Sequence, residues 1–359
     1  MKKINVLMGL ILLIANIFAE DKAENRNGFA AAPFLIYTGE TSFTAGGFVV
    51  KTFRKDSVGD SIPPSSFVVN SMLSVKKNFL SFFNADLVLD EGKVIITPYL
   101  KYQNWPSEYY GMGRNSQEDD ESSYTQETFE IKTDLKYKFA NNLFAKGGLR
   151  YQNAHIHNRE EASLIYTDRE NTYSDQLAGF GAGIEFDSRN NSFYPDKGIY
   201  LYAGITKNLK AFGLDNHKTG RDLDLKYYHS AGANGVLAYQ AKLELNDGRS
   251  PFYEKALLGE ELRAYSNNRY IDDNLYALKT EYRSFPWESG WKKRFGYVIF
   301  AEGGQVFNKI SEVKSNRFKY SVGTGLRFAI IPKEKLNFRF DLAKGDNSFQ
   351  VIFIAREAF

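Results

Sequence analysis

The sequence predicts an all-β fold, a single transmembrane antiparallel β-barrel of about 16 strands. Three observations predict it: long segments in which apolar and polar residues alternate, an even number of such segments, and connections that are short and long in turn. In one segment Phe129, Ile131 and Leu135 share a face, while Glu130 and Lys132 share the other. Many segments exceed the roughly 9 to 11 residues that a tilted strand needs to cross a bilayer. An oily face toward lipid and a charged face toward a wet lumen explain the alternation.

The amino-terminal residues are typical of a secretory signal peptide. Lys2 and Lys3 precede an apolar run, NVLMGLILLIANIF, that ends near the small residue Ala19. The alternative, a membrane anchor, is disfavoured because the run is shorter than the roughly 20 residues of a spanning helix. We expect three parts in the chain: a signal peptide at residues 1–19, a short periplasmic segment at 20–29 and the outer-membrane barrel at 30–359.

The expected strands follow from the alternation and from the breaks between segments. The first eight lie at residues 30–38, 43–54, 65–78, 80–90, 93–105, 124–139, 143–157 and 175–189. The last eight lie at residues 197–210, 221–232, 235–247, 274–285, 292–307, 317–330, 335–344 and 348–359. Pro98 falls inside the fifth segment, although proline cannot donate a hydrogen bond to a strand ladder.

The connections indicate how the barrel sits in the membrane. Short links such as DEGK, ANN and GANG follow even strands, and the longest links, including residues 248–273, follow odd strands. Outer-membrane barrels keep short turns in the periplasm and long loops outside. We therefore expect an outer-membrane protein of a Gram-negative-type bacterium with both termini in the periplasm. The link RKDSVGDSIPPSS is long for a periplasmic turn.

The composition narrows the functional classes. The chain contains 29 Phe and 23 Tyr but only 9 Pro, which favours strands. Its net charge of +3 falls to +1 if the signal is removed with Lys2 and Lys3, so nothing favours nucleic acid as a partner. With no Cys, the chain has neither a disulfide nor a lipid-modified cysteine.

The loop between the eleventh and twelfth expected strands contains the segment GEELRAYSNNRY, residues 259–270. Here the sequence resembles the bacterial surface antigen superfamily, the outer-membrane barrels of the BamA and TamA type and of two-partner secretion. In that family this loop folds back into the lumen, and its tip reads Val/Ile-Arg-Gly-Phe/Tyr. The matching tip here is Leu262, Arg263, Ala264 and Tyr265.

The resemblance also implies a partner for the loop. The family's arginine docks against the acidic residue of a Phe-x-Asp-x-Gly motif on the thirteenth strand, so we expect Arg263 to bind Glu302. The matching acceptor strand carries Phe300, Glu302 and Gly304. The alternative is that Arg263 is a solvated loop cation and that Glu302 only lines the pore. Ala264 stands where the family has Gly, so backbone strain is expected there.

The inward face of the fourteenth expected strand supports this docking. Gly323 and Gly325 share that face with Ser321 and Arg327, and their missing side chains leave room for a loop against the wall. An arginine also engages a carboxylate bidentately, which fixes orientation as well as position.

Further matches to the family cover residues 175–359, and the amino-terminal half agrees only in strand count and in YYGMG. They include TEYRSFP, SVGTGLRF and the ending REAF, together with Gly181, Gly183, Asp187, Arg189, Pro195 and Gly198. In the last segment Phe349, Val351, Phe353, Ala355 and Phe359 fall on one face. A final Phe in such a pattern resembles the signal by which outer-membrane barrels are recognised for insertion.

The resemblance implies a barrel that assists insertion or translocation of proteins or other substrates, with a lateral seam between its first and last strands. It would fall in the branch without periplasmic polypeptide-transport-associated domains, since only residues 20–29 follow the signal. The alternative is a passive or structural channel for small solutes, plugged by its own loop. The implied partners are outer-membrane lipid, the outer-membrane assembly machinery for which the chain is a client, and an unfolded barrel substrate or periplasmic partner.

No enzymatic activity, cofactor or metal is expected. His155 and His157 could form half of a metal site, but no third ligand is evident and a solvated rim is favoured. The acidic run EDDE at 118–121 could collect divalent cations, yet an exposed acidic loop is the simpler interpretation. The sequence has no G-x-S-x-G motif, phosphate loop or cysteine nucleophile.

Overall fold

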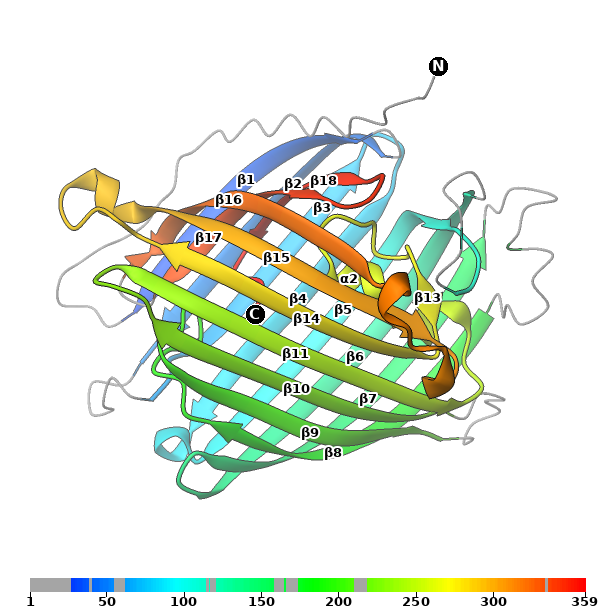
Figure 1. Cartoon of the computed structure of the whole chain (residues 1–359), viewed down its shortest axis with the longest axis horizontal. Helices are drawn as coiled ribbons and strands as arrows, with labels where there is room; N and C mark the ends of the chain where they lie inside the picture. The colour runs from blue at the N-terminus through cyan, green and yellow to red at the C-terminus, as the bar shows by residue number, and fades with distance from the viewer. Residues whose placement is uncertain are drawn as a thin grey trace.

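The computed structural model contains one antiparallel sheet of 16 strands, which confirms the predicted all-β fold (Figure 1). The structure describes residues 27–38, 41–54, 62–113, 116, 121–157, 165, 174–209, 218–332 and 335–359. The expected signal peptide, the segment 20–26 and most of the acidic run EDDE lie outside the described residues. Among the residues described, no helix is long and apolar enough to cross a membrane.

Each strand of the sheet pairs with the next along the chain, and all sixteen expected strands are present with their ends within four residues of the expected positions. The strands are β1 Gly28–Thr38, β2 Ser42–Phe53, β3 Ser65–Ser74, β4 Phe79–Leu89, β5 Val94–Tyr109, β6 Ser122–Ala140, β7 Leu143–His157, β8 Ser174–Asp187, β9 Gly198–Asn208, β10 Lys218–Ser230, β11 Gly235–Gly248, β14 Asn274–Ser284, β15 Phe295–Phe307, β16 Lys319–Ile331, β17 Leu336–Lys344 and β18 Phe349–Ala355.

The remaining elements are short and lie in the connections. Two-residue strands β12 Ala256–Leu257 and β13 Ile271–Asp272 pair with each other inside the loop between β11 and β14. The helical turns are η1 Asp90–Gly92, η4 Phe252–Glu254, α2 Leu258–Glu261, η5 Trp291–Arg294, η6 Ile310–Glu312 and η7 Ser315–Arg317.

The alternation of side chains places the apolar face outside and the charged face inside. On β6, Phe129, Ile131 and Leu135 are exposed on the outer surface, whereas Glu130 is only 3% exposed in the lumen. Successive side chains of a strand point to opposite faces, so each strand carries both surfaces at once.

Pro98 is accommodated by a break in one ladder. It pairs with Thr133 of β6, but the register between β4 and β5 passes from the pair Asn84–Tyr99 directly to the pair Leu87–Ile96. The hydrogen bond that proline cannot donate therefore falls where the ladder is already interrupted.

The two outermost strands, β1 and β18, do not form a ladder with each other among the described residues. Instead, the inner face of β1 and β2 packs against the outer face of the carboxy-terminal strands. The ring of Phe48 on β2 lies 4.9 Å from that of Phe338 on β17, which in turn stacks on Phe353 of β18 at 5.1 Å. Ala30 and Ala32 of β1 join this seam cluster. The sheet edges thus overlap by face contact rather than by backbone pairing.

The end of the chain departs from the expected strand at 348–359. Strand β18 ends at Ala355, because Arg356 takes a positive φ of 80° and its N–H donates to the carbonyl oxygen of Asn337. Phe359 is 9% exposed and packs beside Tyr228 in the lumen. The expectation that Phe359 lies on the last strand and shares its face with Phe349, Val351 and Phe353 is wrong, since the strand ends at Ala355 and the chain turns inward.

Because the sheet edges overlap at the seam, shortening a side chain inside the seam cluster should destabilise the barrel more than shortening one outside it. Phe338→Ala should destabilise the barrel by about 3 to 5 kcal/mol, because it removes a buried ring from the seam cluster. Phe340→Ala is the matched control, since Phe340 lies on the same face of the same strand and is less buried. Urea unfolding in detergent measures both. Equal losses from the two variants contradict the packing described.

Candidate functional site: a loop docked across the lumen

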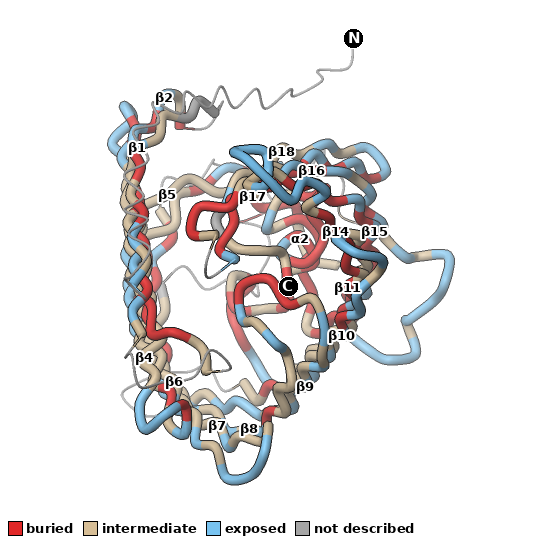
Figure 2. The backbone as a smooth tube through the Cα atoms, turned by 90° about the vertical axis from the view of Figure 1, so that its left-hand side faces the viewer, coloured by how far each residue is buried: buried red, intermediate tan, exposed pale blue. Residues whose placement is uncertain are grey.

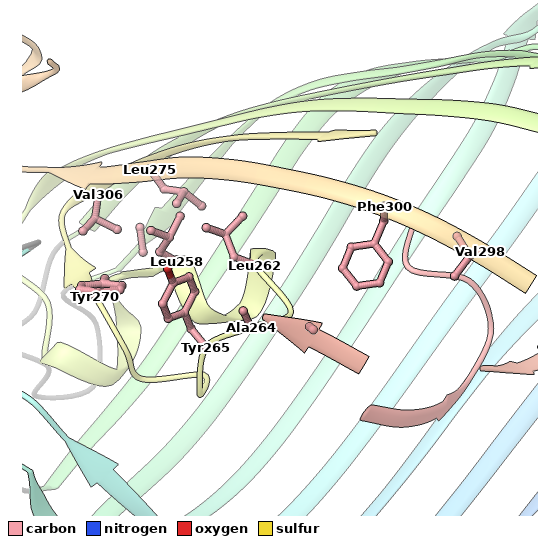
Figure 3. Packing of buried hydrophobic residues seen from close by; sticks show 11 residues of the cluster. Leu258, Leu262, Ala264, Tyr265, Tyr270, Leu275, Val298, Phe300 and Val306 are labelled. Atoms are coloured by element: carbon pink, nitrogen blue, oxygen red, sulfur yellow. The ribbon is translucent and has the colours of Figure 1, made fainter. Parts of the chain in front are cut away.

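The loop between β11 and β14, residues 249–273, enters the lumen and is held against two sides of the barrel (Figure 2). Its central segment is buried: Leu258, Leu262 and Ala264 are each 0% exposed. These residues pack with Phe300 and Val298 of β15, as Figure 3 shows. Apolar side chains of the loop thus replace water along this wall, which supplies most of the driving force for docking.

Arg263 sits at the centre of the docked loop and contacts a different carboxylate with each of its nitrogens. Its Nε donates to Glu302 Oε1 at 2.7 Å, its NH1 donates to Asp341 Oδ2 at 2.8 Å, and its NH2 donates to Glu281. Its backbone N–H also donates to Glu302 Oε2 at 2.8 Å. The structure therefore brings Arg263 to Glu302, the partner implied by the sequence, but the contact is not a two-pronged fork.

Burial and charge determine the state of this arginine. Burial alone would lower the pKa of the Arg263 guanidinium, but the surrounding carboxylates outweigh burial and raise it. The guanidinium carbon lies 3.4 Å from the centre of the Phe300 ring, so Phe300 covers one face of the cation. Arg263 stays charged, and its charge is shared among three strands of the wall.

Sequence reasoning missed two of the three carboxylates, Glu281 on β14 and Asp341 on β17. A signal for them was present, because each is acidic and lies on the charged face of its strand, within TEYRSFP and KLNFRFDLA. Alternation says only that such a residue points inward. Which inward residues meet depends on the curvature of the wall.

The inward glycines make room for this cluster, as the sequence predicted for the wall. A Cβ at Gly323 would overlap the ring of Phe300, and a Cβ at Gly325 would overlap the carboxylate of Asp341. At Gly304 a Cβ would meet Leu258 of the loop at 2.9 Å. Side chains at these positions would push the loop and its acceptors away from the wall.

The strain expected at Ala264 is absent. Ala264 is not among the described residues with positive φ, and its N–H donates to Ser321 Oγ at 3.1 Å. The positive φ of the loop is found at Tyr270, at 63°. Tyr265 packs edge-on against Tyr270 at 5.3 Å and donates its hydroxyl to the carbonyl oxygen of Tyr320. The loop thus needs no glycine at its tip.

A second anchor lies two residues earlier in the loop, at Glu261. Its carboxylate accepts hydrogen bonds from Lys242 at 2.5 Å and Lys279 at 2.6 Å, on β11 and β14. Burial alone would raise the pKa of Glu261, but the two lysines outweigh burial and lower the pKa to about 2. This anchor therefore stays ionised over nearly the whole pH range in which the barrel is handled.

A third anchor ties the start of the loop to the opposite wall. Glu254 accepts hydrogen bonds from Arg150 and Gln152 of β7 at 2.7 Å each. The ring of Phe252 packs between Tyr109 of β5 and Tyr124 of β6, at 4.7 and 5.5 Å. The loop therefore bridges β5–β7 on one side and β11–β17 on the other.

The charge cluster continues from the loop to the end of the chain. Arg283 donates to Glu281 at 2.6 Å and to the main-chain oxygen of Phe359 at 3.0 Å. Arg327 donates to Asp341 at 2.5 Å and to Glu357 at 2.7 Å. Two short routes of ion pairs and hydrogen bonds thus connect Arg263 with the segment 356–359.

The other residues singled out by the sequence lie elsewhere. Arg189 pairs with Asp187 through two hydrogen bonds of 2.9 and 2.7 Å, beside the link between β8 and β9 rather than at the loop. His155 lines a shallow outer depression beside Glu127 near the end of β7. Within the described residues, no group of three or more His, Cys, Asp or Glu could hold a metal ion.

These features define a class of protein: an antiparallel β-barrel with an apolar outer face and a lumen that is occupied by one of its own loops. An Omp85 superfamily domain matches residues 80–348. The chain belongs to the Omp85 superfamily, which confirms the resemblance to BamA/TamA-type surface antigen barrels.

Solved structures with a similar fold include BamA and CdiB. The crystal structure of BamA from Haemophilus ducreyi lacking POTRA domains 1–3 is 14% identical, with a TM-score of 0.57, and the match covers 92% of this chain and 70% of that one. CdiB from Escherichia coli is 12% identical, with a TM-score of 0.61, over 91% of this chain and 60% of that one. At these identities the likeness shows the fold alone. The chain spans about 60 to 70% of the length of these two proteins, and no curated protein matches it.

Removing the central arginine should release the loop. Arg263→Ala should cost about 3 to 5 kcal/mol, because three buried carboxylates lose their shared cation. Arg221→Ala is the matched control: Arg221 pairs with Asp247 at the exposed end of β10, and such a pair contributes about 0 to 1 kcal/mol. Urea unfolding and limited proteolysis of the loop measure the difference.

A charge exchange at the same position is a sharper test. Arg263→Glu combined with Glu302→Arg should recover little of the stability lost by Arg263→Glu alone, because Glu281 and Asp341 still face the new carboxylate. Full recovery by the double variant would mean that Glu302 is the only acceptor of importance.

The ion pairs of Glu261 predict that the stability of the barrel depends on pH. Glu261→Gln should cost about 3 kcal/mol near neutral pH, the equivalent of a pKa lowered from 4.5 to about 2. Because the folded-state pKa is lowered, this contribution is complete above about pH 4.5 and is lost as the pH falls toward about 2. Urea midpoints of both proteins across that window measure it. Glu260→Gln is the control: burial raises the pKa of Glu260, so this change should not destabilise the barrel near neutral pH.

Proposed function

We propose that this barrel assists the insertion or translocation of proteins at the outer membrane. The observation that carries the proposal is the seam, where β1 and β18 share no ladder among the described residues and the sheet edges overlap through side chains. Each outermost strand keeps a row of backbone groups available for pairing, and such an edge is a template for a strand of another chain. A substrate strand can therefore add to the sheet without breaking an existing ladder.

The connections support the orientation that this function needs. Links after even strands include the two residues 141–142 and the four residues 231–234, whereas those after odd strands include residues 110–121 and 249–273. With short turns in the periplasm, the start of β1 and the end of β18 face the periplasm. A substrate arriving from the periplasm then meets the seam at the end where both strands are accessible.

The docked loop has a complementary role in this proposal. Its anchors on β7, β11 and β14–β17 fix the walls on both sides of the lumen while the seam is open. A barrel held open by substrate loses the support of a closed sheet, and an internal strut replaces part of that support. Leu262, Arg263 and Tyr265 are the residues to which we assign this role.

The experiment that tests the proposal uses purified barrel in liposomes and a small urea-unfolded barrel protein as substrate. We expect the reconstituted barrel to accelerate substrate folding without leakage of an entrapped solute. The seam is then locked by Asp86→Cys with Arg356→Cys and a short bifunctional maleimide, since these side chains, on β4 and just after β18, lie 3.8 Å apart and the chain has no other cysteine. Locking should abolish the acceleration.

The matched control is the same cross-link at Arg221→Cys with Asp247→Cys. These residues form an ion pair on β10 and β11, two neighbouring strands in the continuous part of the sheet. This lock should leave the acceleration unchanged. No acceleration by the unlocked barrel, or equal acceleration with the seam locked, contradicts the proposal. Leakage without acceleration favours a solute channel instead.

A further inference from the structure

The link between β14 and β15, residues 285–294, carries a group of side chains that the proposed function does not use. It contains two of the three tryptophans of the chain, Trp287 and Trp291, which are 45% and 70% exposed. Lys292 and Lys293 are also exposed, and with Arg294 and Glu288 they give the link a formal charge of +2. Large exposed aromatic side chains of this kind mark interaction surfaces.

The link at residues 285–294 and its two flanking strands form a hairpin that points away from the lumen. In Figure 1 the gold link between β14 and β15, which contains η5, extends beyond the ends of the neighbouring strands at its end of the barrel. The hairpin therefore extends toward the surroundings of the barrel rather than toward the loop that fills it.

A series of contacts between aromatic rings joins the hairpin to the lipid-facing surface. Trp291 packs edge-on against Phe295 at 5.3 Å, and Phe295 packs against Phe328 of β16 at 5.2 Å. Farther along the same outward faces, Ile299 of β15 and Leu326 of β16 are 58% and 61% exposed. Trp291 thus lies at the edge of the apolar band, where the hydrocarbon of a bilayer gives way to headgroups.

We propose that this hairpin docks on anionic phospholipids of the periplasmic leaflet. Trp287 and Trp291 lie at the boundary of the acyl chains, and Lys292 and Lys293 pair with headgroup phosphates. Amphipathic indole rings favour this depth of the membrane, and basic residues beside it are attracted to anionic lipid. The inference goes beyond the proposed function and rests on it only for the leaflet that the hairpin faces.

The test uses the tryptophans as reporters. Trp105→Phe leaves only Trp287 and Trp291 to emit, and this variant is reconstituted into phosphatidylcholine vesicles containing a minority of phosphatidylglycerol. Two preparations are compared: in one the phosphatidylcholine carries bromine in its acyl chain close to the headgroup, and in the other the phosphatidylglycerol does. The brominated lipid has the same mole fraction in both. We expect the brominated phosphatidylglycerol to quench at least about twofold more strongly, because the basic residues enrich anionic lipid around the hairpin. High salt should reduce the difference.

Charge variants separate this site from general attraction to the protein. Lys292→Glu with Lys293→Glu should abolish the preference for phosphatidylglycerol. Lys76→Glu with Lys77→Glu changes the charge equally on the link between β3 and β4 and should leave the preference intact. Equal quenching by both lipids in the parent protein, absence of quenching by either, or a preference that survives the change at Lys292 and Lys293 overturns the proposal. None of these outcomes depends on whether the barrel folds a substrate.

Discussion

The interaction on which the rest of this structure depends is the burial of Arg263 in the lumen. A guanidinium does not give up its proton in a protein, so it can be buried only where carboxylates surround it. The structure supplies three, from β14, β15 and β17, and the removal of any one leaves a nitrogen of the buried guanidinium without its partner. One loop residue thereby fixes the relative positions of three wall strands. The cluster as a whole contains four arginines, Arg263, Arg283, Arg327 and Arg339, and four side-chain carboxylates, Glu281, Glu302, Asp341 and Glu357.

The same cluster explains why the sheet closes by overlap. The inward turn at Arg356 places Glu357 and Phe359 within reach of Arg327 and Arg283, so the end of the chain is held inside the lumen. Strand β18 is therefore only seven residues long, against eleven for β1. The outer face of the carboxy-terminal strands then needs apolar cover. Ala30 and Ala32 are small enough to let the inner face of β1 approach them closely.

The sequence predicts the positions of the strands well, but it predicts the side-chain contacts between them poorly. Every strand of the barrel separates lipid from lumen, so alternation is imposed locally and residues such as Phe129 and Glu130 reveal it without knowledge of the fold. The contact between Arg263 and Glu302 was reached through a motif, which records a long-range contact that no local pattern contains. Asp341 lies 78 residues from Arg263 and belongs to no such motif, so only the curvature of the wall brings them together.

Two errors of the sequence analysis have a common cause. One is the expectation that Phe359 shares a face of the last strand, and the other is the expectation of backbone strain at Ala264. Both arguments assumed a backbone conformation that the residue types do not fix. In the structure the positive φ values fall at Tyr270 and Arg356 instead. Neither residue type favours that region, so packing and hydrogen bonds around these two positions decide it rather than intrinsic preference.

The two routes from Arg263 to the segment 356–359 make the loop and the seam thermodynamically dependent on each other. Glu281 is shared by Arg263 and Arg283, and Asp341 is shared by Arg263 and Arg327. If a substrate strand displaces β18 and withdraws Glu357 and Phe359, the two wall arginines lose partners and bind the shared carboxylates more strongly. Arg263 must then compete for them, so opening of the seam loosens the loop. Linkage is reciprocal, and a loop pulled away from the wall loosens the end of β18 by the same free energy.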